Sequence, residues 1–204
     1  MTDIYSLDAE TRCLVLVGEF LRKWASMEGA LRTAMQIALG LDPFQTAIVT
    51  SNTQLRSKIN ILGPPISMGP FENEKIDRFK KTLNDIGQAA GNRNMMAHDA
   101  FAPSSDGSAV SFAVTKAKGG PLSFPETLWD VSRFKTEYAE IERLQAGVEE
   151  IIEAINQKDV IDRMRETARV HPAAIYYFTS FVQGTPPALL DSLSSATAAP
   201  KTDD

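Results

Sequence analysis

The stretch Gly91-Asn92-Arg93-Asn94-Met95-Met96-Ala97-His98-Asp99 closes a long amphipathic segment that begins near Phe71. Within this segment apolar residues recur at intervals of three and four, which is the spacing of one helical face. The pattern predicts a helix from Phe71 to about His98, whose inward residues are Ile76, Phe79, Leu83, Ile86 and Ala90. Together with two further long helical patterns, it predicts an all-α bundle.

Arg93 stands where this apolar stripe continues towards Ala97. An arginine at a core position is unusual for packing alone, because its guanidinium stays charged and must find acceptors. Asn94 and His98 are four residues apart and share a helical face, while Arg93 lies about 100° behind Asn94. We expect the three side chains to point towards one cleft at the helix end.

These three residue types supply the groups that metal-independent RNA cleavage requires. An arginine binds phosphate, an amide donates and accepts hydrogen bonds, and an imidazole exchanges protons near neutral pH. The reaction needs one group to take the 2′-hydroxyl proton, another to protonate the leaving 5′-oxygen, and positive charge on the phosphorane. One chain supplies a single strong candidate, His98, because His171 precedes a proline and is predicted to be a turn residue.

The string from Arg93 to His98 resembles the Arg-polar-x-x-x-His signature of HEPN domains, which are α-helical modules of many prokaryotic toxins and antiviral RNases. The resemblance extends more loosely to the helix before it and to the Trp24-x-x-x-Glu28-x-x-Leu31 pattern. It implies a HEPN-like antiparallel helical bundle. It also implies a homodimer in which the motifs of both copies line one composite cleft.

The same resemblance implies roles for the motif residues. His98 would act as general acid or base, Arg93 would bind and stabilise the scissile phosphate, and Asn94 would orient phosphate or ribose. The products would carry a 2′,3′-cyclic phosphate and a 5′-hydroxyl. The implied function is a metal-independent endoribonuclease of toxin or antiviral type, with RNA as substrate, an antitoxin or other protein as partner, and no cofactor or metal.

The first long helix is predicted from a cap at Ser6 or Asp8 to about Gly40, where glycine and Asp42-Pro43 end it. Its stripe is Leu14, Val17, Leu21, Trp24, Glu28, Leu31 and Met35, which only Glu28 interrupts. A buried acid is costly unless it is paired, so Glu28 is expected to meet a cation, with Arg93 as the favoured partner. The alternative is a rotated stripe with Met27 inward and Glu28 solvated.

From Pro43 to Leu62 the pattern predicts one or two short helices, with Thr53 as a cap and Gly63-Pro64-Pro65 as the stop. Lys58 lies among the apolar residues Leu55, Ile59 and Leu62. It either brings positive charge to a groove or buries its stem and leaves its ammonium in water.

The segment from Asp99 to Asp130 contains turn residues around an alternating run, Ala109 to Lys116. This alternation predicts a small β-hairpin insertion at about residues 101–125, and an irregular loop is the alternative. Val110, Phe112 and Val114 share one face, so we expect the hairpin to cover a flank of the helices with Lys116 and Lys118 near its far end.

A third long helix is predicted from Val131 to Asn156, capped by Asp130 or Ser132 and antiparallel to another long helix. Its acid-rich outer face is expected to be solvated. Its inward residues are Phe134, Tyr138, Ile141, Leu144, Val148, Ile151 and Ile155.

The C-terminal part predicts a helix from Lys158 to Val170 and an aromatic cluster at residues 175–181, which packs on the bundle or covers a partner. The expected organisation is one domain over residues 1–183 and a disordered, flexible tail over residues 184–204, where Pro, Ala, Ser and Thr dominate.

Composition limits the remaining choices. The 204 residues are 43% hydrophobic and 23% charged, which suits one globular domain. The net charge of −5 is poor for broad attraction of nucleic acid, so any RNA contact must be local. The single cysteine, Cys13, is expected in the core, and without a membrane span or signal peptide the protein is expected to be soluble and cytoplasmic.

Two further functions stay open at this stage. One is a non-catalytic HEPN binding or regulatory module, which an Arg93–Glu28 pair and the acidic composition would suit. The other is a helical protein-interaction domain that uses the aromatic cluster, with the motif a coincidence. No Gly-rich phosphate loop, zinc-ligand spacing or Ser/His/Asp arrangement supports another chemistry.

Overall fold

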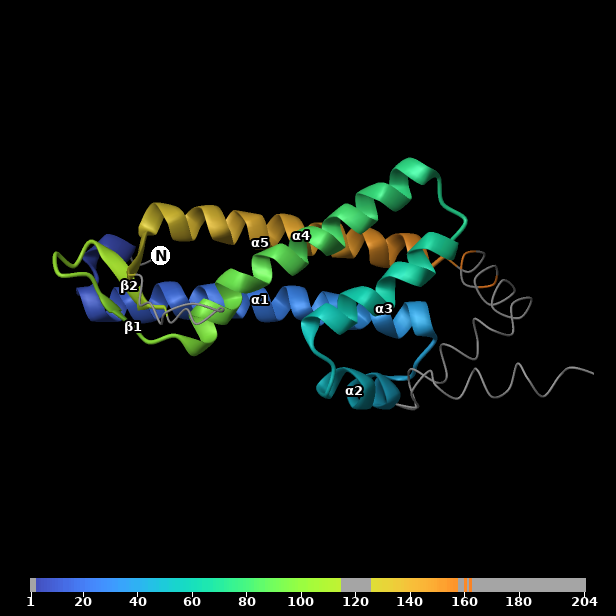
Figure 1. The fold of residues 1–204 in the computed structure, drawn as a ribbon, viewed down its shortest axis with the longest axis horizontal. Helices are drawn as coiled ribbons and strands as arrows, with labels where there is room; N and C mark the ends of the chain where they lie inside the picture. The colour runs from blue at the N-terminus through green and yellow to red at the C-terminus, as the bar shows by residue number, and fades with distance from the viewer. Residues whose placement is uncertain (1–2, 115–125, 158–159, 161, 163–204) are drawn as a thin grey trace, which may run out of the picture.

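Three long helices form the body of the computed structural model, which describes residues 3–114, 126–157, 160 and 162. They are α1 (Ala9–Leu39), α4 (Asn73–His98) and α5 (Val131–Ile155). α1 and α5 lie side by side in one layer, and α4 crosses them obliquely in a second layer together with the shorter α3 (Leu55–Met68) (Figure 1). The mostly helical fold that the periodicity predicts is confirmed.

The direction of the helices differs from a simple antiparallel bundle. α4 and α5 are antiparallel, since Arg78 pairs with Glu150 and Asp85 with Arg143. α1 and α5 run parallel, because the chain returns along α4 to the end at which α1 began before α5 starts (Figure 1). The Tyr138 hydroxyl on α5 fixes this pair by donating a 2.6 Å hydrogen bond to the carbonyl of Leu16.

α1 begins and ends at the predicted positions. The Asp8 side chain accepts a 2.9 Å hydrogen bond from the backbone N–H of Thr11, whereas Ser6 ends a short 3-10 helix, Ile4–Ser6. At the other end Gly40 has φ 62°, a left-handed conformation that glycine adopts without steric cost.

The buried face of α1 is rotated from the predicted stripe. Met27 is fully buried, whereas Leu14 is 59% exposed. Positions 13, 20, 27 and 34 alternate with 17, 24 and 31 along the helix, so the contact follows a seven-residue repeat and Leu14 falls outside it. The buried residues are Cys13, Leu16, Val17, Phe20, Trp24, Met27, Leu31, Ala34 and Met35, which confirms the core position of Cys13.

Two shorter helices follow, α2 (Pro43–Ser51) and α3 (Leu55–Met68). α2 starts with a capping box between Asp42 and Gln45, but Thr53 does not cap α3, because its hydroxyl donates to the carbonyl of Val49. The predicted stop at Gly63-Pro64-Pro65 is also wrong. α3 continues to Met68 although the prolines remove two N–H donors, because Pro65 and Ile66 are buried and hold its last turn in the core.

α2 buries its polar side and exposes its apolar side. Thr46 and Thr50 are buried, and their hydroxyls donate to the backbone carbonyls four residues before them. Phe44 and Ile48, one turn apart, are 74% and 55% exposed.

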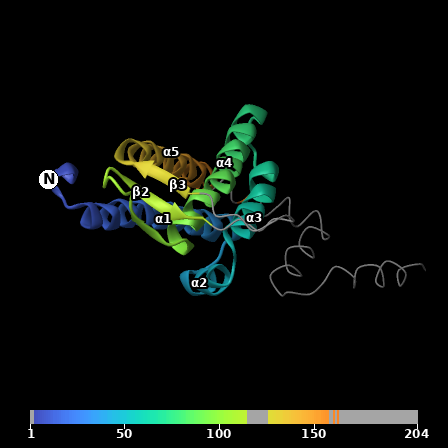
Figure 2. The same ribbon diagram turned by 60° about the vertical axis from the view of Figure 1, so that its left-hand side comes forward.

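The predicted hairpin is a three-stranded antiparallel sheet in the order β1 (Phe101–Pro103), β2 (Ala109–Ala113) and β3 (Glu126–Asp130). It lies beside the N-terminal ends of α1 and α5 (Figure 2). Val110 and Phe112 are buried against the helices as predicted. β3 is the missed strand, and in it Trp129 is buried while Leu128 is exposed. Lys116 and Lys118 lie outside the described residues.

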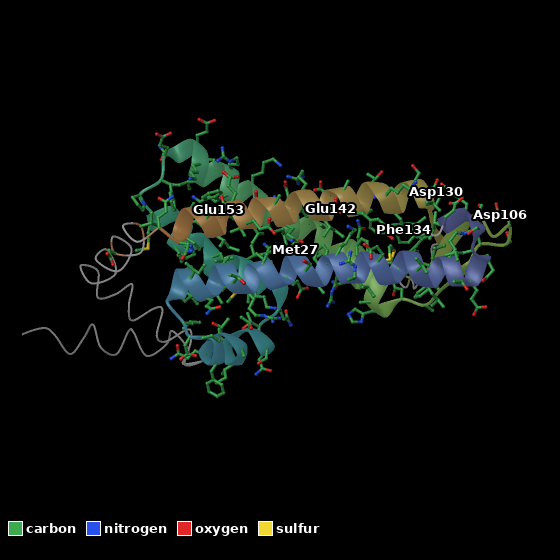
Figure 3. The ribbon with its side chains drawn as sticks, turned by 180° about the vertical axis from the view of Figure 1, so that it is seen from behind. Met27, Asp106, Asp130, Phe134, Glu142 and Glu153 are labelled. Atoms are coloured by element: carbon green, nitrogen blue, oxygen red, sulfur yellow. The ribbon has the colours of Figure 1, made fainter. Side chains whose placement is uncertain are left out.

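α5 begins directly after β3, where the Asp130 side chain accepts a 2.7 Å hydrogen bond from the N–H of Arg133. Met27 of α1 and Phe134 of α5 both lie in the layer between these helices, at different levels along them, and Asp106 and Asp130 lie towards the sheet end (Figure 3). Of the predicted helix from Lys158 to Val170, the structure describes only Val160 and Asp162, both helical, while the aromatic cluster, His171 and the tail fall outside the described part. Within that part, no helix has the length and apolar character to cross a membrane.

Candidate functional site

The structure brings the three motif residues together at the C-terminal end of α4. His98 is the last residue of the helix, and Arg93 and Asn94 lie a turn or more before it. Nη1 of Arg93 is 3.2 Å from Oδ1 of Asn94, to which it donates a hydrogen bond, and 3.5 Å from Nε2 of His98. One guanidinium nitrogen therefore lies within reach of both partners.

The three side chains form a surface patch rather than an extension of the core. Asn94 and His98 are exposed, and the Arg93 side chain retains 34% of its accessible surface. The buried position after Ala90 is Met96, not Ala97, which is exposed. The apolar stripe thus passes to one side of Arg93, and the guanidinium remains open to a ligand.

Glu28 of α1 is the acid that faces Arg93. Its Oε1 lies 4.0 Å from Nε of Arg93 and accepts a 2.7 Å hydrogen bond from Nε1 of Trp24. The predicted pair is present, and Met27 is inward as the alternative held. Glu28 is not solvated, however, since its side chain is only 23% exposed and has partners on three helices.

Lys58 of α3 approaches the same carboxylate from the other side. Its Nζ lies 3.8 Å from Oε2 of Glu28, and only 8% of its side chain is exposed. The interpretation of a wet ammonium is therefore wrong, because Glu28 supplies an internal counter-charge. Two cations share one carboxylate, which leaves the neighbourhood of Arg93 with a local excess of positive charge.

A second buried acid, which the sequence pattern alone did not single out, holds the motif from α5. Asn92 Nδ2 donates a 2.9 Å hydrogen bond to Oε2 of Glu137, whose Oε1 lies 2.6 Å from Nη2 of Arg133. Glu137 is 8% exposed. Its spacing of three from Phe134 and four from Ile141 places it on the inward stripe, which is the signal that identified Glu28.

The motif is consequently held on both sides, by its first residue, Arg93, and by the residue before it, Asn92. Asn92 is bonded to α5, and Arg93 faces the carboxylate from α1. These contacts fix the last turns of α4, so that Asn94 and His98 project from a supported helix rather than from a loose end.

The chemical capacity of the patch is phosphate binding with proton transfer. Arg93 offers N–H donors for phosphate oxygens, Asn94 an amide, and His98 an imidazole. Among the described residues no group of three or more His, Cys, Asp or Glu side chains is arranged to hold a metal ion. Comparison with protein-family models, with curated proteins and with solved structures finds no match. The resemblance to HEPN domains therefore stays a prediction that depends on the residues from Arg93 to His98.

Proposed function

We propose that this chain is a HEPN-type, metal-independent endoribonuclease. The observation that carries the proposal is the contact of Arg93 Nη1 with both Asn94 and His98 on the surface of α4. A scissile phosphate bound by the guanidinium would lie beside the imidazole. His98 would then exchange protons with the 2′-hydroxyl or the leaving 5′-oxygen, and Arg93 would stabilise the charge of the phosphorane.

Glu28 supports this arrangement without entering the chemistry. Its position on the Nε side of Arg93 leaves the Nη atoms, of which Nη1 contacts Asn94 and His98, on the side of the guanidinium where a phosphate would bind. Trp24 fixes the carboxylate by a hydrogen bond. Lys58 offsets the negative charge of Glu28, so that the acid does not repel a phosphate at Arg93.

The reaction requires an acid and a base, whereas the described part of one protomer contains one imidazole, that of His98. We therefore include a second copy of the chain in the proposal, whose own His98 would supply the other group in a composite cleft. A toxin or antiviral role belongs to the same proposal, because such an enzyme would degrade cellular RNA.

The test is RNA cleavage by the purified protein in chelator, with product ends analysed. Wild type should release 2′,3′-cyclic phosphate and 5′-hydroxyl ends, and His98→Ala should lose the activity by 100-fold or more, as expected of a general acid or base (roughly 10²–10⁴). His98→Ala should melt as wild type does, because the side chain is exposed. Equal cleavage by wild type and His98→Ala, or none by a folded wild-type dimer, would overturn the proposal.

A cell growth experiment addresses the toxin role separately. Expression of wild type should slow bacterial growth, and His98→Ala should relieve the effect at the same protein level. Growth inhibition that survives the substitution would show that toxicity has another source.

One observation favours a second candidate, a non-catalytic module that binds RNA or protein. Arg93 faces a partly buried acid, a position that a purely structural arginine would also occupy. For such a module, Arg93→Ala would lower the melting temperature while the wild type shows no cleavage. In the enzyme, Arg93→Lys should keep most of the stability and lose cleavage, because lysine cannot bind phosphate through two nitrogens.

A further inference from the structure

A groove between α3 and α4 lies outside the candidate site. The two helices are neighbours in both ribbon views (Figures 1 and 2), and the groove between them has a volume of about 370 Å³. Its lining combines apolar side chains and glycines with two cations and two amides. The residues are Arg56, Ile59, Asn60, Gly63, Lys80, Leu83, Asn84 and Gly87.

The polar side chains of this groove have no partners in the part of the chain that the structure describes. In the described ranges, Arg56, Asn60, Lys80 and Asn84 make no side-chain hydrogen bond and no ion pair, and all four are exposed. No acidic side chain lines the groove. The two cations that line the groove thus have no counter-charge among the described residues, in a chain whose net charge is −5.

A second groove shows that this pattern is not general for the protein. It lies between α1 and α5, has a volume of about 300 Å³, and is lined by both cations and acids. There Lys23 pairs with Glu142 and with Glu19, and Arg22 pairs with Glu19. Charges in that groove are already neutralised, whereas those of the α3–α4 groove are available to an anionic ligand.

The α3–α4 groove also points along α4 towards the candidate site. At 100° per residue, Lys80, Asn84, Gly87, Gly91, Asn94 and His98 lie within about 40° of one line on the helix. The distance along that line from Lys80 to His98 is about 27 Å at 1.5 Å per residue. The groove, Asn94 and His98 therefore occupy one face of α4, and Arg93 reaches this face from about 100° behind Asn94 through its contact with that side chain.

Two glycines, Gly87 and Gly91, leave the surface of α4 without side chains along this line. A Cβ atom at Gly87 would lie 3.7 Å from Nη1 of Arg56, so the guanidinium rests just above the α4 backbone. Gly91 is exposed, and a Cβ atom there would meet nothing within 4 Å. A ligand strand can thus pass from the groove to Asn94 close to the helix surface.

We infer that the α3–α4 groove binds the phosphodiester backbone of single-stranded RNA adjoining the bond at His98, an inference that rests on the proposed function. Arg56 and Lys80 contact phosphates. Asn60 and Asn84 bond to ribose or base edges, and Ile59 and Leu83 form an apolar floor. A single strand is the anion that fits, because its charges repeat along a line and its bases offer groups for amides.

The experiment measures binding apart from cleavage. Fluorescence anisotropy of a labelled 2′-O-methyl RNA, which cannot be cleaved through its 2′-oxygen, gives Kd as a function of salt. The double variant Arg56→Gln/Lys80→Gln should bind at least tenfold more weakly. Its log K versus log salt slope should be smaller in magnitude by about 1.4, because each phosphate of a single strand that the protein neutralises adds about 0.7 to that slope.

Two controls keep the result specific. Lys135→Gln removes an exposed lysine of α5 and should leave Kd and slope unchanged. Gly91→Leu adds a side chain on the line between groove and motif and should weaken binding, whereas Gly18→Leu, at another exposed helical glycine, should not. Thermal melting identifies any variant that fails to fold, and the two positions then test the inference independently.

The outcomes separate this inference from the proposed function. Tight binding that the double variant and Gly91→Leu leave intact would overturn the groove assignment and not the enzyme. Weakened binding in both variants without cleavage by wild type would support the groove and remove the enzyme. Absence of RNA binding by wild type, or equal affinity for a poly-glutamate of the same charge, would overturn RNA as the ligand.

Discussion

Oε1 of Glu28 and Nε of Arg93 lie 4.0 Å apart across the contact between α1 and α4. This separation exceeds a hydrogen bond, so the acid acts on the arginine through charge, while its own position is fixed by Trp24. Glu28 also lies 3.8 Å from the nearly buried ammonium of Lys58. The carboxylate is therefore the point at which α1, α3 and α4 are electrostatically joined.

Glu28→Gln should lower the free energy of unfolding by about 1–3 kcal/mol, because Lys58 loses its counter-charge in a position with little access to water. Urea denaturation at neutral pH measures the change. Glu153→Gln, at an exposed acid of α5, is the control and should change stability by less than about 0.5 kcal/mol.

Addition of Lys58→Met to Glu28→Gln should recover part of the loss, since a well-packed apolar side chain can replace a buried ion pair. A Glu28→Gln protein as stable as the Glu153→Gln control would contradict the role assigned to the carboxylate. So would a double variant less stable than Glu28→Gln alone.

Asn92→Ala should lower the free energy of unfolding by about 1–2 kcal/mol, because Glu137 is buried and loses one hydrogen bond while it keeps Arg133. Asn84→Ala, an exposed asparagine of the same helix without a partner among the described residues, is the matched control for stability. Chemical denaturation of both variants checks the difference, and equal stabilities would show that the Asn92–Glu137 bond contributes nothing.

Gly147→Ala should destabilise the protein by about 1 kcal/mol or more, although alanine favours helices over glycine. A Cβ atom at position 147 would lie 2.8 Å from Cγ2 of Thr82, which is itself buried. Thr82→Ala removes that methyl group and should restore much of the stability. Gly18→Ala, which meets nothing within 4 Å, should instead stabilise by about 0.5–1 kcal/mol. Four melting curves decide whether α4 and α5 touch at this point.

Asp106 should contribute an acid-dependent part of stability. Hydrogen bonds from Ser104 and Ser108 lower the pKa of this carboxyl from 3.8 to about 2. The unfolded chain therefore binds a proton first as pH falls, so the contribution is complete above about pH 4 and is lost by about pH 2. Asp106→Asn should flatten the fall in stability across that window. Identical pH profiles of the denaturation midpoint in wild type and variant would contradict this prediction.

The long helices were predictable because their end signals are local. Asp8 and Asp130 accept hydrogen bonds from backbone N–H groups in the first turns of α1 and α5, and Gly40 ends α1. Each residue acts within one turn of its own position. The end of α3 was predicted wrongly because Pro64 and Pro65 were also interpreted as local signals. Their local effect opposes a helix, whereas burial of Pro65 and Ile66 against distant residues decides the outcome.

The third strand escaped prediction because its alternation is short and one of its apolar residues faces solvent. Leu128 is 56% exposed although it is apolar. The segment Thr127-Leu128-Trp129 therefore lacks the alternation of polar and apolar residues that identifies a half-buried strand. Pairing with β2 and burial of Trp129 between Phe20 and Phe134 define the strand, and of these contacts the pairing and the Phe20 contact lie beyond the strand's own neighbourhood in the sequence.

The candidate site was predictable in part. The spacing of Arg93, Asn94 and His98 on one helix determines their proximity, and the interruption of an apolar stripe identified Glu28. Glu137 also interrupts an apolar stripe, that of α5. The helix contains so many glutamates, however, that the sequence does not distinguish the one that faces inward. The unpartnered cations at Arg56 and Lys80 follow only from the packing of α3 on α4.

The parallel pairing of α1 with α5 has a consequence for synthesis of the protein. Leu16 is separated from its partner Tyr138 by 122 residues, and Lys23 from Glu142 by 119. A nascent chain that has emerged as far as His98 already contains both motif and Glu28, but the apolar side of α1 still lacks its largest partner. Folding must therefore finish after translation has passed α5, and until then the ribosome-bound chain exposes the apolar side of α1 that α5 will cover.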